Sequence, residues 1–202
     1  MLRRSLGVKK IKVGHAGTLD PLATGVMILC TGKATKKIDT FLHQDKEYVA
    51  TIKLGATTPS YDAETEENQS FPTAHITKEL VEQTIEQFVG DIEQIPPSYS
   101  AIRVNGKHAY ELARKSVEVE MEPRKVRIEK IELLEYSLPV IKLRIACSKG
   151  TYIRSLARDL GNALQSGAYL IGLQRTKIGS VSLDDCITIE QFEDLIEQRK
   201  II

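Results

Sequence analysis

Two segments of alternating apolar residues lie close together in the second half of the chain, and they constrain the fold more than any other feature. They are Lys125–Tyr136 and Val140–Cys147, with three residues between them. A period of two is typical of a half-buried strand. Strands that follow one another directly in sequence favour a largely antiparallel sheet.

The other predicted elements are unevenly interspersed. Strand patterns cover Lys46–Leu54 and Leu170–Ile178, and a short apolar run covers Val26–Cys30. Helices are predicted at Ala34–Leu42, Thr77–Val89, Gly106–Lys115, Tyr152–Leu164 and Thr188–Lys200. This order predicts an α+β fold with a mixed, largely antiparallel sheet flanked by helices, and not a doubly wound sheet.

One polar segment interrupts these elements. Gly55–Phe71 is acidic and has prolines near both ends, Pro59 and Pro72. Such composition predicts a long loop or an inserted excursion from the sheet, and long loops in compact domains usually carry function.

Composition limits the class of protein. A chain of 202 residues with 42% hydrophobic content can bury the core of one domain, and no domain linker is evident. No apolar stretch approaches the ~20 residues of a membrane span, and no apolar h-region follows the N-terminal arginines. Three widely spaced cysteines fit a reduced cytoplasm. No spacing of metal ligands and no glycine-rich phosphate loop is present, so nothing requires a metal or a nucleotide cofactor.

Charge is distributed unevenly although the net charge is only +1. Residues 1–37 carry eight Lys or Arg and one acid, whereas residues 60–98 carry nine acids and one Lys. A basic arm of this kind attracts a polyanion such as nucleic acid to one face. The alternative is an ordinary solvated charged surface.

The run from Gly14 to Gly25 predicts a catalytic loop. Its glycines permit backbone conformations closed to other residues, and Pro21 disfavours helix at Asp20. The carboxylate therefore lies on a rigid turn that suits a nucleophile. The alternative for an isolated Asp-Pro is an Asx-type turn with no chemical role.

The same run resembles the signature loop of the TruB family of pseudouridine synthases, in the order His, Thr-Leu-Asp-Pro, Ala-Thr-Gly. Three more segments resemble that family, and the similarity extends from Lys9 to about Gly179. They are Lys46–Ala50, Pro96–Ala101 and Cys147–Gly161. The resemblance implies a pseudouridine synthase core and an activity that isomerises uridine 55 in the T-loop of tRNA. It implies base flipping, cleavage of the glycosidic bond with Asp20 as nucleophile, and no cofactor.

Two alternatives to this function stay open. In the first alternative, the chain is a catalytically silent RNA-binding or RNA-folding module. In the second, it is a guide-RNA-dependent synthase of the dyskerin type. Multiple turnover on a bare T-stem-loop would exclude both alternatives.

The resemblance further implies that Arg154 pairs with Asp20, holding the carboxylate ionised and oriented. Arg158, one helical turn later, is the competing candidate, and a helical Arg on the surface is by default solvated.

Aromatic and apolar residues complete the predicted site. Tyr48 offers a flat ring for the extruded base and a hydroxyl for proton transfer, although an aromatic in a strand is by default a packing residue. Tyr152 is expected to line the pocket, and Leu173 to form an apolar wall.

His15 is expected to wedge into the RNA where the extruded base had stacked; the alternatives are a general base or a structural role. We expect Lys9, Lys10 and Lys12 to contact phosphates together with the other basic residues of the arm. Those other residues are Arg3, Arg4, Lys33, Lys36 and Lys37. The alternative is that any one of these side chains is free in solvent.

Both ends depart from the family pattern. The chain is expected to be a single catalytic domain, 1–202, that lacks the usual N-terminal strand and the C-terminal RNA-binding PUA domain. We expect a cytoplasmic monomer with tRNA as its partner and no contact with membranes.

Overall fold

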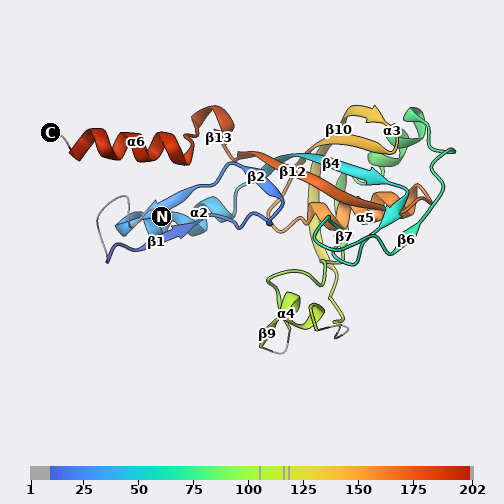
Figure 1. Cartoon of the computed structure of the whole chain (residues 1–202), viewed down its shortest axis with the longest axis horizontal. Helices are drawn as coiled ribbons and strands as arrows, with labels where there is room; N and C mark the ends of the chain where they lie inside the picture. The colour runs from blue at the N-terminus through green and yellow to red at the C-terminus, as the bar shows by residue number, and fades with distance from the viewer. Residues whose placement is uncertain (1–9, 105, 116, 118, 201–202) are drawn as a thin grey trace.

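The computed structural model describes residues 10–200 apart from 105, 116 and 118. A seven-stranded sheet forms its centre, in the order β13-β12-β4-β11-β10-β7, with β2 beside β12 (Figure 1). In chain order these strands are β2 Ala23–Gly25, β4 Lys46–Leu54, β7 Gly90–Gln94, β10 Arg124–Ser137, β11 Val140–Cys147, β12 Ala168–Ile178 and β13 Val181–Ser182. The two long strands predicted in the second half, β10 and β11, are antiparallel neighbours.

The sheet is mixed and mostly antiparallel, as predicted. β12 runs antiparallel to β4, with Arg175 opposite Tyr48, and parallel to β2, with Arg175 opposite Gly25. β4 therefore pairs with β11 on one side and with β12 on the other. This arrangement places the C-terminal half of β12 beside the segment that directly follows the predicted catalytic loop.

Two of the helices contribute buried residues to the core. The helices are the 3-10 helices η1 Gly32–Lys37 and η2 Leu183–Asp185 and the α-helices α2 Ile38–Leu42, α3 Lys78–Glu86, α4 Ala109–Ala113, α5 Ile153–Ala163 and α6 Ile189–Lys200. Ile153, Leu156 and Leu160 of α5 pack into the same buried cluster as Val81 and Ile85 of α3. Thr77 caps α3 as predicted, because its hydroxyl accepts the Leu80 N–H at 3.2 Å.

Two predicted helices differ from the structure, the first in helix type and the second in extent. The segment Ala34–Leu42 is α-helical only in α2, because the Thr35 hydroxyl donates to the Gly32 carbonyl at 2.8 Å and supports a tighter 3-10 turn before it. The segment Gly106–Lys115 is helical only in α4. Gly106 has φ 81° and lies at the turn of a hairpin, so the helix begins later.

Three short two-stranded sheets lie outside the central one. They are β1 Val13–His15 with β3 Leu29–Thr31, β5 Ala56–Thr57 with β6 Gln69–Ser70, and β8 Arg103–Val104 with β9 Lys107–His108. The apolar run Val26–Cys30 is accordingly a strand only in its last part. The excursion Gly55–Phe71 leaves the sheet at β5 and returns through β6.

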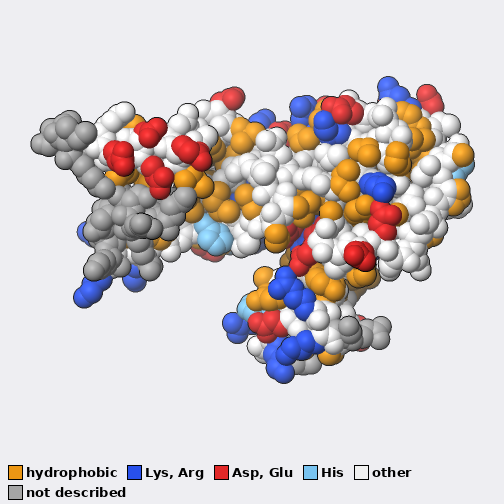
Figure 2. All heavy atoms as spheres, in the orientation of Figure 1, with side chains coloured by type: hydrophobic (Ala, Val, Ile, Leu, Met, Phe, Trp, Pro, Cys, Tyr) orange, Lys and Arg blue, Asp and Glu red, His pale blue; other side chains and the backbone are white. Residues whose placement is uncertain are grey.

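Residues 96–123, apart from 105, 116 and 118, form a lobe between β7 and β10, called here the α4 lobe. It hangs away from the sheet in Figure 1, and Figure 2 shows Lys and Arg side chains gathered on it. Exposed basic residues of the lobe are Arg103, Lys107, Arg114 and Lys115. Among the described residues, no helix is long and apolar enough to cross a membrane.

Candidate active site

Asp20 lies on the loop between β1 and β2. The loop turns sharply there, since the Ala23 N–H donates to the Asp20 carbonyl at 2.8 Å. Gly17 has φ 95°, a conformation that glycine adopts freely, and it lets the chain reverse before Asp20. The Asp20 side chain keeps 35% of its surface exposed, so it is accessible from solvent.

Arg154 contacts Asp20 through two nitrogens. Its Nε lies 2.9 Å from Oδ2, and its Nη2 donates to Oδ1 at 3.2 Å. Arg154 stands in the first turn of α5 and is 3% exposed. The ion pair implied by the resemblance is therefore present, joining residues 134 positions apart in sequence.

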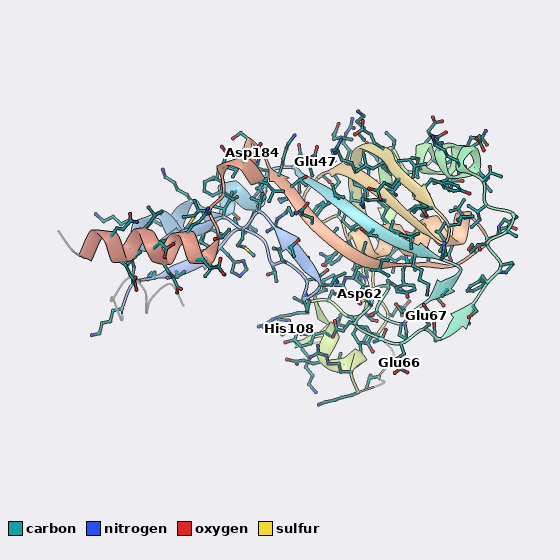
Figure 3. All side chains as sticks on the ribbon, turned by 45° about the horizontal axis from the view of Figure 1, so that its top comes forward. Glu47, Asp62, Glu66, Glu67, His108 and Asp184 are labelled. Atoms are coloured by element: carbon teal, nitrogen blue, oxygen red, sulfur yellow. The ribbon has the colours of Figure 1, made fainter. Side chains whose placement is uncertain are left out.

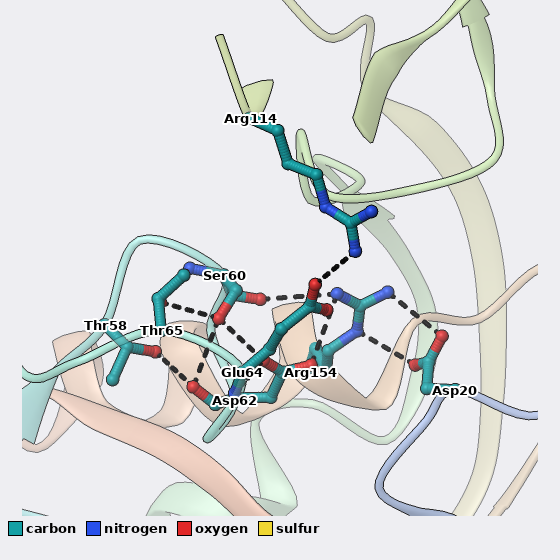
Figure 4. Close-up of polar contacts among 8 residues, drawn as sticks. All are labelled: Asp20, Thr58, Ser60, Asp62, Glu64, Thr65, Arg114 and Arg154. Atoms are coloured by element: carbon teal, nitrogen blue, oxygen red, sulfur yellow. Dashed lines mark hydrogen bonds and ion pairs between the residues drawn. The ribbon is translucent and has the colours of Figure 1, made fainter. Parts of the chain in front are cut away.

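A second carboxylate supports Arg154 from behind (Figure 4). Asp62 is fully buried, and its Oδ2 lies 3.4 Å from Nη1 of Arg154. The Asp62 Oδ1 accepts the Ser60 hydroxyl at 2.6 Å and the Glu64 N–H at 2.9 Å, and the Asp62 carbonyl accepts the Thr58 hydroxyl at 2.7 Å. We call residues 58–62 the support turn.

The support turn was not predicted from the sequence, although the excursion that contains it was expected to carry function. The signal was a run in which Thr58, Ser60 and Asp62 alternate with other residues. Hydroxyl groups placed beside a carboxylate are typical of a buried, hydrogen-bonded charge.

Burial and charge act against each other at Asp20. Burial raises the pKa of its carboxyl, the Arg154 charge and hydrogen bond lower it, and the charges of Asp62 and Glu64 raise it. The net result is a pKa above the ordinary value. Perturbed carboxyls of this kind are characteristic of functional sites.

Arg175 holds the loop from the other side, and the sequence analysis missed it as well. It is 2% exposed; its Nε donates to the Val26 carbonyl at 2.8 Å and its Nη2 to the Gly17 carbonyl at 3.1 Å. A Cβ on Gly25 would lie 2.2 Å from the Arg175 carbonyl oxygen, so the loop can approach β12 only at a glycine. An Arg within a strand carried no distinctive signal.

Both predicted aromatic residues lie within reach of the Asp20 charge. Burial is the largest cause of a raised pKa in both Tyr48 and Tyr152, and the Asp20 charge also raises both. Tyr48 lies on β4, packed against the core. Tyr152 directly precedes α5, and its N–H donates to Gln94 Oε1 at 2.8 Å. Leu173 is buried on β12, opposite Ala23.

Other predicted residues lie outside this group. His15 is exposed on β1, opposite Leu29, and Lys10 and Lys12 are exposed just before β1. Lys9, Arg3 and Arg4 lie outside the described residues.

Arg158, the competing partner for Asp20, makes different contacts. Its Nη2 lies 2.6 Å from Asp159 Oδ1, and its guanidinium stacks 4.8 Å from the centre of the Tyr61 ring.

Comparison with known families gives two matches that together cover nearly the whole chain. Residues 3–153 match the model of the TruB family pseudouridylate synthase N-terminal domain. Residues 154–200 match the model of the tRNA pseudouridylate synthase B C-terminal domain.

Curated relatives share this similarity. A tRNA pseudouridine synthase B of Parabacteroides distasonis is 63% identical over 200 residues, which is 99% of this chain and 85% of the relative. The protein of the same name from Flavobacterium johnsoniae is 52% identical over 189 residues, covering 94% of this chain and 82% of that protein.

Solved structures confirm the fold class. A chain of a Cbf5-Nop10-Gar1 complex superposes with a TM-score of 0.74 at 27% identity, covering 98% of this chain. A chain of an H/ACA RNP bound to a substrate RNA superposes with a TM-score of 0.71 at 26% identity, covering all of it. This chain spans about half the length of those two chains, 50% in each case.

Proposed function

Because this chain belongs to the TruB family of pseudouridine synthases, we propose that its target is uridine 55 in the T-loop of tRNA and that Asp20 is the nucleophile. The chain is an isomerase that converts uridine to pseudouridine in tRNA. The target position and the residues that act on it are the proposed part.

The ion pair between Asp20 and Arg154 is the observation that supports this proposal. Arg154 is buried and cannot leave the site, so it fixes the direction of a carboxylate that is still one-third exposed. A guanidinium that contacts both carboxylate oxygens fixes geometry as well as charge. Asp20 is thereby presented as an oriented anion to a nucleotide that enters from the exposed side.

The reaction balances within one nucleotide. The bond between N1 and C1′ breaks as an Asp20 oxygen bonds to C1′, and the base rotates. A bond then forms between C5 and C1′ as the bond from Asp20 to C1′ breaks, which returns the free carboxylate. C5 loses its proton and N1 takes one up. No atoms or electrons enter or leave, so the chemistry calls for acid-base and nucleophilic groups and not for an electron carrier or group donor.

An extruded base needs surfaces to replace its stack. Tyr48 supplies a ring and a hydroxyl for proton transfer, Tyr152 lines the same pocket, and Leu173 forms an apolar wall beside Ala23. His15, which is exposed on β1, enters the RNA where the base had stacked.

Basic residues on two parts of the molecule hold the T-stem-loop. Lys10 and Lys12 precede β1, and the α4 lobe carries further exposed cations. Such contacts read phosphate positions and RNA shape more than sequence. The protein acts as a monomer, and the free thiols at Cys30, Cys147 and Cys186 suit the reduced cytoplasm where tRNA is processed.

The two alternative functions make a different prediction. A guide-dependent synthase needs a second RNA, and a silent RNA-binding module gives no product. We expect multiple turnovers on a bare T-stem-loop, measured by base-resolved detection of pseudouridine; product only with a guide RNA, or none at all, would contradict the proposal.

Asp20→Asn tests the central assignment. Asparagine keeps the size and most hydrogen bonds of the turn but removes the charge, so tRNA binding should persist while turnover falls below detection. Retention of even a tenth of wild-type turnover, a loss of only ~1.4 kcal/mol, would exclude Asp20 as nucleophile.

The matched control is Asp184→Asn. Asp184 is exposed in η2, and Figure 3 places it well away from Asp62 and the site. This variant should bind and turn over tRNA like the wild type.

A further inference from the structure

Helix α5 contacts the support turn through two arginines, not one. Arg154 reaches Asp62, and Arg158, one helical turn later, stacks on the neighbouring Tyr61. Only the first of these contacts belongs to the chemistry proposed above.

Tyr61 has an unusual backbone. Its φ is 62°, in the left-handed region, where a bulky residue other than glycine is uncommon. The Tyr61 N–H donates to the Thr58 carbonyl at 3.2 Å, and the Leu170 N–H donates to the Tyr61 carbonyl at 3.0 Å. The left-handed residue thus stands directly before Asp62 and directs the chain into the buried site.

Arg158 is placed to hold Tyr61 in that conformation. Its guanidinium lies 4.8 Å from the ring centre, within the range of a cation–π contact. Its side chain is only 17% exposed, and Asp159 fixes it at 2.6 Å. A largely buried guanidinium held by two partners is a stronger constraint than a solvated helical Arg.

We propose that Arg158 is a positioning residue, because its stacking on Tyr61 fixes the turn on which Arg154 rests. This inference depends on the proposed function, since it assigns Arg158 an effect on the same chemistry. Arg158 touches neither Asp20 nor the reacting atoms. It acts through the support turn, which seats Asp62 beneath Arg154.

The test is a double-mutant cycle between Arg158→Met and Tyr61→Gly, using the full chain and a tRNA transcript. Arg158→Met should lower kcat about tenfold, equivalent to ~1.4 kcal/mol, and leave KM unchanged. In the Tyr61→Gly background the same substitution should have little effect, because glycine adopts the left-handed conformation without a clamp. Arg158→Lys keeps a cation over the ring and should retain most of kcat.

A pH profile of kcat adds a measurement that a simple loss of folding stability would not change. If the turn loosens, Arg154 stabilises the Asp20 carboxylate less, and the pKa of Asp20 rises further. The acid limb of kcat should then move to higher pH in Arg158→Met and return in the double variant. The control is Arg127→Met, since Arg127 pairs with Glu129 on the exposed face of β10 and should change neither kcat nor the limb.

Three results would overturn the inference. They are a rise in KM at constant kcat, which would make Arg158 a direct RNA contact; an equal loss of kcat in both backgrounds; and wild-type behaviour of Arg158→Met. Failure of the proposed function is separate, because it shows as turnover in Asp20→Asn whatever Arg158→Met does.

Discussion

At the scale of single residues, Arg154 lies between two carboxylates that differ in exposure. Asp20 is 35% exposed, whereas Asp62 is fully buried with its oxygens committed to hydrogen bonds or to Arg154. One cation therefore serves two anions. The exposed anion is free to react, and the buried one keeps Arg154 in place.

This arrangement predicts a pH dependence. The pKa of Asp20 is raised above its ordinary value, mainly by burial. Because the proposed mechanism needs the carboxylate, kcat should fall as the pH falls through that raised pKa, so the acid limb should lie above pH 3.8, the value of an unperturbed Asp. A profile that stays flat down to pH 3.8 would contradict this.

The raised pKa of Asp20 should also affect folding stability. As the pH falls, the contribution of Asp20 to stability should become more favourable, whereas kcat should decrease. The folded state binds the Asp20 proton more tightly than the unfolded state, so this group penalises folding at neutral pH, and the penalty disappears as the pH falls through the raised pKa. Asp20→Asn should therefore melt no lower than the wild type at pH 7. The difference between the two melting temperatures should shrink in acid.

Residues of the site differed in how far the sequence could predict them. Asp20 and Arg154 lie in motifs whose similarity to a family is specific, and the structure brings them together. Asp62 and Arg175 act through contacts with chain segments about 90 and 150 positions away, as their partners Arg154 and Val26 show. No local pattern encodes such contacts, so only the folded chain reveals them.

At the scale of elements, β12 is the strand that organises the site. It pairs with β4, which carries Tyr48, and with β2, which follows the Asp20 loop. Arg175 adds side-chain hydrogen bonds to this pairing, one to each end of the loop segment from Gly17 to Val26. β12 therefore sets the distance between the loop and the sheet.

Arg175→Met should show how much the Arg175 hydrogen bonds contribute to folding stability and to the placement of Asp20. It leaves two carbonyls without their Arg175 donors, and each unsatisfied buried group costs about 1–3 kcal/mol. We expect a loss of about 2–4 kcal/mol in the free energy of unfolding, measured by urea denaturation, and a lower kcat because Asp20 is less well placed.

Arg144→Met provides the comparison for this substitution. Arg144 is exposed on β11 and pairs with Glu132 at 3.3 Å, and such surface pairs contribute only about 0–1 kcal/mol. Equal losses in the two variants would show that Arg175 does not hold the loop.

Long periodic elements were predictable and short ones were not. The bounds of β4 and β11 match the prediction residue for residue, because alternation over eight or nine residues reflects burial of one sheet face. In η1 and α4, by contrast, a hydroxyl-to-carbonyl bond or a left-handed glycine decides where the helix starts. Such local effects override periodicity in segments of five or six residues.

At the scale of the whole molecule, the acidic and basic segments differ in position and also in whether their charged side chains form ion pairs. Acids of the segment 60–98 find partners in the fold, as Glu67 does with Lys53 and Glu64 with Arg114. Among residues 10–200 that the structure describes, five lysines of the N-terminal part form no ion pair. They are Lys10, Lys12, Lys33, Lys36 and Lys37. These cations are available to phosphates.

RNA binding should therefore weaken steeply with salt, because lysines that bind phosphates release counterions from the tRNA. Replacing Lys10 and Lys12 together by Gln should reduce the slope of log K against log salt by about 1–2, since each phosphate contact contributes roughly 0.7–0.9. Filter binding over a salt series measures this slope.

Lys130 and Lys142 supply the control, because both already pair with glutamates at 2.6 and 2.7 Å. Replacing these two by Gln should leave the slope unchanged. Affinity that does not vary with salt would show that phosphate contacts are not what holds the RNA.

The contact between Asp20 and Arg154 also has a consequence for synthesis of the chain. Asp20 leaves the ribosome before Arg154, which follows 134 positions later, and before Arg175, which follows later still. At about 5–20 residues per second, roughly 8–30 seconds pass between translation of Asp20 and of Arg175. A nascent chain that already carries Lys10 and Lys12 can thus meet RNA before the contacts that orient Asp20 are able to form.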